Sequence, residues 1–328
     1  IKLNTNENPY PPAPGVAEAL KHMDIDRFRK YPDPTASDLV HALAEYYGVG
    51  EDQVFVGVGS DDVIAMSFLT FFNSEKPVFF PDITYSFYKV WADLYRIPYE
   101  CKKVDENFHI IKEDYYPENG GVIFPNPNAP TSIYEDLEFV EDIIRHNQDV
   151  IVIVDEAYID FAGESALSLL DKYDNLIITQ TFSKARSMAG MRIGYAIASP
   201  LLIKYLNDAK YSFNSYTMNK TSLVYGAEAV KDKEYFAETT RKIVETRDWA
   251  EEEFKKLGFV FPKPSANFIF VSHPEYDAKE LFEAMKAKGI YVRFWGSERI
   301  EQYLRVTIGT REEMEALFAF LREYMMKC

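Results

Sequence analysis

Short apolar segments alternate with helical patterns through the first two thirds of the chain, and this alternation limits the folds available to it. The clearest segment is Val150–Val154, five consecutive β-branched residues followed by Asp155. Uninterrupted apolar strands are typical of the buried centre of a parallel sheet. The other strands expected in this region are Val54–Val56, Val78–Phe80, Gly121–Phe124 and Leu176–Thr179. We therefore expect an α/β fold with a large, mostly parallel sheet covered by helices on both faces.

The chain is expected to divide into three parts. Residues 1–34 are rich in proline and asparagine, which prevent long regular elements, and so form an arm. Residues 35–229 hold the alternating strands and form a large domain. Residues 230–328 form a smaller α+β domain, which begins with a long charged helix over Lys231–Leu257. A chain of 328 residues has enough length to bury a core in each domain.

The charge and hydropathy of the chain exclude several classes of protein. The formal net charge is −16, and such an acidic chain repels the phosphate backbone, so no nucleic-acid partner is expected. No apolar run approaches the roughly 20 residues that span a bilayer, so we expect no membrane segment. The chain opens Ile-Lys-Leu-Asn, without the pattern of a targeting leader.

The cysteines and histidines give no sign of a disulfide framework or a metal site. Cys101 and Cys328 are far apart and lack CxxC spacing, which favours a reducing cytoplasm. The five histidines are scattered, without H-x-x-x-H or H-E-x-x-H spacing. We therefore expect no metal.

A lysine with hydroxyl neighbours follows the strand expected at Leu176–Thr179. Lys184 comes after Thr181 and Ser183, and Arg192 lies eight residues later. A lysine whose pKa is lowered by cationic or apolar neighbours is a nucleophile towards an aldehyde. Hydroxyls and a guanidinium are suitable donors to a phosphate. A solvated loop with incidental charges would explain the same segment.

Asp155 supplies a second element of the same chemistry. A carboxylate at the end of a buried strand is costly to desolvate unless it meets a cation or a donor. A site for pyridoxal 5′-phosphate (PLP) needs a lysine for the aldehyde and an acid beside the pyridine nitrogen. Lys184 and Asp155 supply both, although an aspartate that caps the following turn is the alternative.

A glycine-containing turn precedes the helix expected over Val63–Phe72. Ser60 or Asp61, after Gly59, could cap this helix, whose free N–H groups would then point at an anion. The turn is not a dinucleotide fingerprint, because Asp62 occupies the last glycine position. Capping alone explains it, but with Ser183 and Arg192 it could complete a phosphate site.

Together these segments resemble the fold type I PLP-dependent aminotransferases, and among them most closely the histidinol-phosphate aminotransferase subfamily. The resemblance runs from Leu3–Pro9 to Leu304–Glu313, nearly the whole chain. The implied activity is transfer of an amino group from histidinol phosphate to 2-oxoglutarate, giving imidazole acetol phosphate and glutamate in histidine biosynthesis.

The resemblance implies a role for each cofactor-binding residue. Lys184 would bind the cofactor aldehyde and move a proton between the substrate Cα and C4′. Asp155 would keep the pyridine nitrogen protonated, Tyr158 would donate to the O3′ oxygen, and Tyr85 would stack on the ring. The residues implied to hold the cofactor phosphate are Gly59, Ser60, Asp61, Thr181, Ser183 and Arg192.

The resemblance also implies how substrates and a second subunit take part. Arg305 would bind the carboxylate of the keto acid, and Arg293 either binds the phosphate of histidinol phosphate or is a surface arginine. Tyr10 or Asn8 in the arm would close over the substrate. Tyr31 would reach into the neighbouring subunit's site, against cofactor and substrate. A homodimer with composite active sites is therefore expected.

The chain departs from the family pattern at one cofactor contact. Relatives read Asn-Asn-Pro-Thr-Gly, where the second asparagine bonds O3′, but Ala129 stands at that position and Ser132 replaces the glycine. The adjacent Asn128 is an alternative donor only if the loop shifts. The change is expected to alter proton affinity at the cofactor rather than abolish the chemistry, because Tyr158 can still donate.

Other functions remain open at the level of sequence. Within the fold, these are an aromatic amino-acid aminotransferase and a threonine-phosphate decarboxylase-like enzyme. A PLP-dependent regulator would need a DNA-binding region, for which the chain has no spare basic segment. Ser86 and Lys89 match the S-x-x-K pattern of a serine hydrolase, but the S-D-N and K-T-G segments of that class are missing.

Overall fold

A seven-stranded sheet forms the larger part of the computed structural model, which describes residues 1–327; Cys328 lies outside the described residues. Within those residues, every strand of this sheet runs in one direction except β7, which is antiparallel to both neighbours. In order across the sheet, the strands are β1 (Val54–Gly57), β7 (Gly194–Ala198), β6 (Leu176–Thr181), β5 (Val152–Asp155), β4 (Gly121–Pro125), β2 (Val78–Pro81) and β3 (Tyr99–Lys102). The expected α/β class is confirmed.

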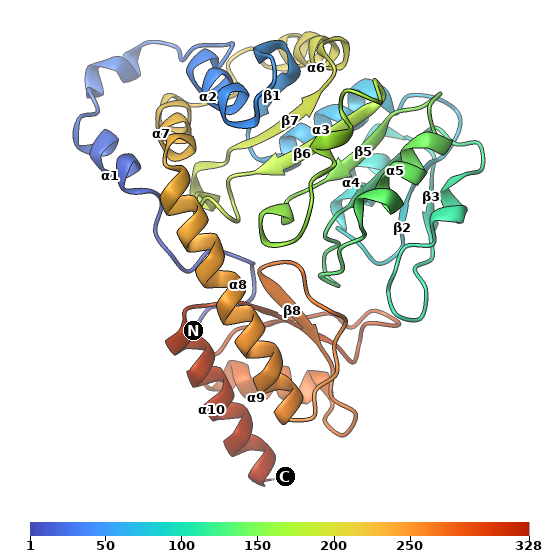
Figure 1. Cartoon of the computed structure of the whole chain (residues 1–328), viewed down its shortest axis with the longest axis vertical. Coiled ribbons are helices and arrows are strands. Elements are labelled where there is room, and N and C mark those ends of the chain that lie inside the picture. Colours follow the sequence, from blue (N-terminus) through green and yellow to red (C-terminus); the bar gives the residue numbers. More distant parts are fainter. Residues whose placement is uncertain (328) are drawn as a thin grey trace.

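Helices cover both faces of the sheet (Figure 1). One core contains α2 (Ser37–Tyr47), α5 (Leu137–His146) and α7 (Lys220–Lys231), and a second contains α3 (Ser60–Phe71), α4 (Phe87–Tyr95) and α6 (Pro200–Phe213). Successive strand residues point to opposite faces, so Val152 and Val154 join the first core while Ile153 joins the second. This explains why the three β5 residues before Asp155 are all apolar.

The central strand starts later than the β-branched run predicts. β5 begins at Val152, and its pairing with β6 begins there too. Val150 is held in a turn instead, since its N–H donates to Asn147 O at 3.2 Å and its carbonyl accepts from Asn175 Nδ2 at 2.9 Å. One backbone bond and one asparagine side chain thus hold Val150 outside the strand.

A second, antiparallel sheet lies in the last third of the chain, in the order β8 (Phe268–Val271), β10 (Leu304–Thr307) and β9 (Arg293–Phe294). It packs with α9 (Ala278–Ala287) and α10 (Arg311–Lys327) around a separate core. The long α8 (Lys233–Lys256) runs from the region of α7 towards this second core (Figure 1).

The first residues of the arm attach to the smaller sheet. Leu3 is buried, and its N–H donates to Tyr291 O at 2.7 Å while its carbonyl accepts from Thr307 N at 3.0 Å. The arm then continues through α1 (Pro14–Lys21) and the 3₁₀ helix η1 (Ile25–Arg29). The remaining 3₁₀ helices are η2 (Glu51–Gln53), η3 (Lys112–Tyr115), η4 (Ile159–Phe161), η5 (Ala166–Leu169) and η6 (Ala189–Met191).

Within residues 1–327, no helix has the length and apolar character needed to cross a membrane.

Candidate active site

A cavity of about 270 Å³ opens at the carboxyl ends of the parallel strands β2, β4, β5 and β6. In open α/β sheets this edge is where ligands bind, because the strand ends and following loops converge there. The residues that line the cavity are Thr5, Glu7, Ser60, Asp61, Tyr85, Pro125, Ala129, Asp155, Ala157, Tyr158, Thr181, Ser183, Lys184, Ala189 and Arg192.

One end of the cavity offers donors to an anion. α3 begins at Ser60, and its N-cap, Gly59, makes no side-chain capping bond. The expectation that Ser60 or Asp61 caps the helix is wrong: the nearby Asp62 Oδ2 instead accepts the N–H of Val58 at 2.8 Å. The first N–H groups of α3 are therefore left without a side-chain cap, at the positive end of the helix dipole.

Arg192 lies at the same end. Its Nη1 donates to Ser183 Oγ at 3.4 Å, and its Nη2 donates to Asp61 Oδ2 at 3.3 Å. Gly59 has φ of +87°, and a Cβ there would lie 2.5 Å from Arg192 Nη2. The absence of a side chain at Gly59 thus makes room for the guanidinium.

Asp155 lies at another wall of the cavity and is only 5% exposed. Its carboxylate accepts the Tyr88 hydroxyl at 2.7 Å and the Thr179 hydroxyl at 3.3 Å. Burial raises the pKa of Asp155 to about 6, and the Tyr88 hydrogen bond opposes the rise. Tyr88 could not be identified from the sequence as a partner of Asp155. The one available signal was its spacing of four residues from Ala92, which places both on the same face of a helix.

The S-x-x-K residues are not part of this cavity. Ser86 and Lys89 are both exposed at the start of α4, and neither lines the cavity. Nothing in this arrangement supports a serine hydrolase.

Lys184 projects into the cavity from the loop after β6. Its Nζ donates to Thr5 O at 3.2 Å and lies 5.6 Å from the centre of the Tyr158 ring. Thr5 and Glu7 bring the arm into the cavity wall, whereas the sequence indicated Tyr10 or Asn8 as the arm residues at the site. The pKa of Glu7 is lowered, chiefly by its hydrogen bond from Lys2, with a smaller contribution from Lys184.

Two tyrosines border the cavity and are held by hydrogen bonds. Tyr158 accepts a hydrogen bond from Asn6 Nδ2 at 2.9 Å. Tyr85 donates to Asp61 Oδ1 at 2.7 Å, and its ring stacks on Phe87 with centres 5.6 Å apart. Asp61 therefore holds both Tyr85 and Arg192. The contact of Asn6 with Tyr158 was also not predicted from the sequence.

The Asn128–Ala129 segment is arranged so that alanine, not asparagine, lines the cavity. The amide of Asn128 is buried and its groups have other partners, because Nδ2 donates to Ile83 O at 2.9 Å and Oδ1 accepts from Thr84 Oγ1 at 3.0 Å. The structure does not bring the Asn128 side chain into the site.

Two arginines lie side by side on the smaller sheet. Arg293 of β9 and Arg305 of β10 are directly opposite in the antiparallel register, so their side chains leave the same face. Both guanidinium groups lie near Trp295, 5.3 and 5.1 Å from its ring. Arg305 Nη2 donates to Asn4 O at 3.0 Å, while its Nε has no hydrogen-bond partner among the described residues. Burial lowers the pKa of Arg305.

The remaining expected residues lie outside the cavity wall. Asn8 Nδ2 donates to the carbonyls of Lys184 and Ala185, both at 3.1 Å. The ring of Tyr10 lies 5.6 Å from Lys242 Nζ. Tyr31 is 79% exposed, and its ring stacks on Tyr216 with centres 4.7 Å apart.

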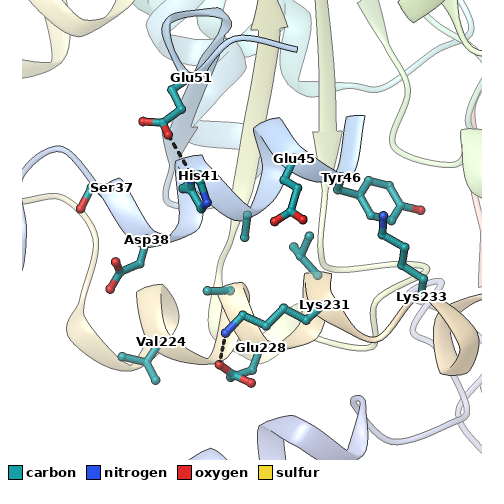
Figure 2. Close-up of a pocket in the computed structure, with 13 residues that line it drawn as sticks. Ser37, Asp38, His41, Glu45, Tyr46, Glu51, Val224, Glu228, Lys231 and Lys233 are labelled. Atoms are coloured by element: carbon teal, nitrogen blue, oxygen red, sulfur yellow. Dashed lines mark hydrogen bonds and ion pairs between the residues drawn. The ribbon is translucent and has the colours of Figure 1, made fainter. Parts of the chain in front are cut away.

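A larger hollow of about 750 Å³ lies between α2 and α7, and Figure 2 shows its charged lining. Four of its charged side chains form two pairs: His41 Nδ1 lies 2.7 Å from Glu51 Oε1, and Lys231 Nζ lies 2.6 Å from Glu228 Oε1 (Figure 2). It contains no equivalent of Lys184 with a buried acid. The smaller cavity is therefore the candidate active site.

Within residues 1–327, no group of three or more His, Cys, Asp or Glu side chains is placed to hold a metal ion.

Comparison with known proteins agrees with this geometry. Residues 1–321 match the family of class I and II aminotransferases, and the chain belongs to this family of PLP-dependent transaminases. The histidinol-phosphate aminotransferase of Clostridium botulinum (strain Okra / Type B1) is 47% identical over 327 residues, which cover 100% of this chain and 92% of the relative.

Solved structures share the fold. The histidinol-phosphate aminotransferase of Clostridium acetobutylicum superposes with a TM-score of 0.92 at 22% identity, covering 100% of both chains. That of Sinorhizobium meliloti, in complex with pyridoxal 5′-phosphate, gives a TM-score of 0.87 at 23% identity, covering 98% of this chain and 91% of the other. The expected fold type I architecture is confirmed.

Proposed function

We propose that this chain transfers the amino group of histidinol phosphate to 2-oxoglutarate, using PLP bound in the cavity. The observation that carries the proposal is one cavity that holds Lys184, the buried Asp155 and the anion-binding end at Arg192. These groups suit the aldehyde, the pyridine nitrogen and the phosphate of PLP respectively. The names of the full-length relatives support the choice of substrate.

Each protein group has a defined task in the proposed reaction. The cofactor, when bound, withdraws electrons from the substrate Cα. Asp155 keeps the pyridine nitrogen protonated, which requires its own carboxyl group to be ionised. Tyr158 donates a hydrogen bond to O3′. Lys184, as a free amine, would take the proton from the substrate Cα and return it at C4′.

We propose that the arginine pair binds the acidic groups of the two substrates. Two positive charges directly opposite on neighbouring strands repel, and an anion between them relieves the repulsion. Arg305 is assigned to the carboxylate of the 2-oxo acid, because its unpaired Nε leaves a donor for a fork-shaped contact. Arg293, the more exposed of the two, is assigned to the phosphate of histidinol phosphate.

We propose that the protein is a homodimer whose partner covers α4. Phe87, Val90 and Leu94 are exposed and spaced along one face of this helix. Phe87 stacks on Tyr85, which lines the cavity, so a copy seated on α4 would reach the cavity rim. The exposed Tyr31 is assigned to the partner's cavity, which would make each active site composite.

We also propose that the functional units divide at residues 34/35 and 229/230. Support comes from α8, which begins at Lys233, directly after the last helix that packs on the large sheet. A cytoplasmic location remains a prediction from the sequence.

An absorbance titration tests the proposed function. Purified protein with added PLP should show a visible cofactor band that converts to the pyridoxamine form at low histidinol phosphate, and only at much higher phenylalanine. Conversion by both donors at similar concentrations would instead indicate a broad aromatic aminotransferase. Release of carbon dioxide from threonine phosphate would indicate the decarboxylase, and the absence of a cofactor band would overturn the proposal.

A further inference from the structure

We propose that Asn6 is a positioning residue that directs the hydroxyl proton of Tyr158 towards O3′ of the cofactor. This inference rests on the proposed function and adds a residue from the N-terminal arm to the machinery. Asn6 Nδ2 donates to the Tyr158 hydroxyl at 2.9 Å, across 152 residues of sequence.

The orientation of the Asn6 amide is fixed by Thr307. The Thr307 hydroxyl accepts the backbone N–H of Asn6 at 3.0 Å and donates its own proton to Asn6 Oδ1 at 3.0 Å. Because Oδ1 faces a donor on that side, the NH₂ group faces Tyr158. The hydrogen bond to Tyr158 therefore has a defined direction.

The backbone of Asn6 is held as firmly as its side chain. Its carbonyl accepts from Asn267 Nδ2 at 3.0 Å, and the residue is 1% exposed. Its φ of +56° lies in the left-handed region, which asparagine tolerates better than most residues. Position 6 therefore requires a small polar residue that tolerates a positive φ and reaches the Tyr158 hydroxyl.

The contact decides where Tyr158 can send its proton. A hydroxyl that accepts a hydrogen bond from an amide keeps its single proton for another acceptor. The Tyr158 ring is itself fixed edge-on against Phe268, with centres 5.0 Å apart. Its proton then points away from Asn6, and O3′ of the proposed cofactor would be its acceptor in the adjoining cavity.

The alanine at position 129 makes the direction of the Tyr158 hydroxyl proton more important. An alanine side chain lines the cavity and has no donor, while the Asn128 amide is bonded elsewhere. Tyr158 is thus the side chain assigned to O3′, and its orientation is not backed by a second donor. The hydrogen bond from Asn6 orients the Tyr158 hydroxyl for this single contact with O3′.

The test is the pH dependence of the visible absorbance of the PLP-loaded protein. A hydrogen bond to O3′ stabilises the anionic oxygen, and so favours loss of the proton held between O3′ and the Lys184 nitrogen. Losing that hydrogen bond therefore raises the pH midpoint of the absorbance change. Asn6→Gly, which suits a positive φ, should raise the midpoint by about 0.5–1 pH unit. Asn6→Asp should raise it further, because a carboxylate accepts the Tyr158 proton.

Controls separate positioning from general loosening of the arm. Asn4→Gly, two residues away and without contact to Tyr158, should leave the midpoint unchanged. Tyr158→Phe should raise the midpoint, and Asn6→Gly should add nothing in that background, since Asn6 acts through the missing hydroxyl. An effect of Asn6→Asp smaller than that of Asn6→Gly would indicate a merely structural role.

The outcomes that overturn the inference are distinct from failure of the proposed function. If the unmodified protein shows a cofactor band and Tyr158→Phe moves its midpoint, an unchanged midpoint in both Asn6 variants removes Asn6 from this role. If the unmodified protein shows no cofactor band, the proposed function itself fails, and this inference fails with it.

Discussion

The hydroxyl of Tyr88 donates to Oδ2 of Asp155 over 2.7 Å, inside the core between α4 and the sheet. Both residues are buried, and burial dominates the pKa of Asp155, holding it at about 6. The hydrogen bond from Tyr88 therefore keeps the pKa of Asp155 lower than burial alone would set it. The desolvated carboxylate is thus ionised at neutral pH.

Tyr88→Phe should shift cofactor binding to higher pH. Loss of the donor raises the Asp155 pKa further, so the carboxylate becomes protonated at a higher pH and no longer pairs with the pyridine nitrogen. The acid-side midpoint of PLP affinity should rise by about 0.5–1 pH unit. The check is PLP dissociation constants measured from pH 5 to 8. Tyr99→Phe, at a half-buried tyrosine on β3 whose hydroxyl bonds Asp93 rather than Asp155, should not move the midpoint; an equal shift in both variants would contradict the assignment.

Asp155→Asn should stabilise the cofactor-free protein while abolishing transamination. The folded-state pKa of Asp155 lies above its ordinary value of 3.8, so its contribution to stability is fully present below pH 4 and is lost as pH rises through about 6. Removing the buried charge should therefore raise the free energy of unfolding most at pH 7–8, by on the order of 3 kcal/mol, and least near pH 4. Chemical denaturation at both pH values measures this. A variant less stable than the parent at pH 8 would contradict it.

Gly59→Ala should weaken PLP binding through Arg192. The added Cβ would lie 2.5 Å from Arg192 Nη2, and alanine is strained at φ of +87°. A displaced guanidinium loses a charge-assisted contact, so PLP affinity should fall about 10- to 100-fold. Affinity for pyridoxal, which lacks the phosphate, should change little. Gly190→Ala is the matched control, because a Cβ there meets nothing within 4 Å.

Arg293→Ala should impair a phosphorylated donor more than an unphosphorylated one. We expect the KM for histidinol phosphate to rise about 10- to 100-fold, as expected for loss of a charge-assisted hydrogen bond, and that for phenylalanine to change less than about threefold. Arg293→Lys should give an intermediate result, since lysine keeps the charge without the planar fork. Steady-state kinetics with both donors decides, and equal losses would remove Arg293 from the phosphate role.

Leu94→Arg should weaken the proposed dimer. Leu94 is 67% exposed on the apolar face of α4, and a charge buried in an interface without a partner is costly. Sedimentation velocity should show more monomer for this variant over a dilution series. Met326→Arg, which changes an 80% exposed methionine on α10, should sediment like the parent.

The residues at strand ends could be predicted from sequence because each follows a local pattern. Asp155 and Lys184 follow apolar runs, and Ser60 follows a glycine turn before a helix. Their convergence then follows from parallel strands ending at one edge. Strand β7 could not be predicted, because its Gly-Tyr-Ala-Ile-Ala sequence has few β-branched residues.

Contacts between distant segments left no local pattern. Asn6 meets Thr307 across 301 residues and Tyr158 across 152. Nothing in the Asn-rich arm distinguishes Asn6 from Asn4 or Asn8, since only the folded arm decides which amide reaches the phenol. The same holds for Tyr88, which is one apolar residue among several on α4 until it meets Asp155.

Helix α8 connects the two cores as a single continuous helix. Its 24 residues span about 36 Å, with Lys233 5.3 Å from the ring of Tyr46 at one end and Phe254 packed in the smaller core at the other. A tilt of about 5° at its first turn would displace its last turn by about 3 Å. A change in packing near Tyr46, which does not line the cavity, would thus alter how closely the arginine pair approaches the cavity.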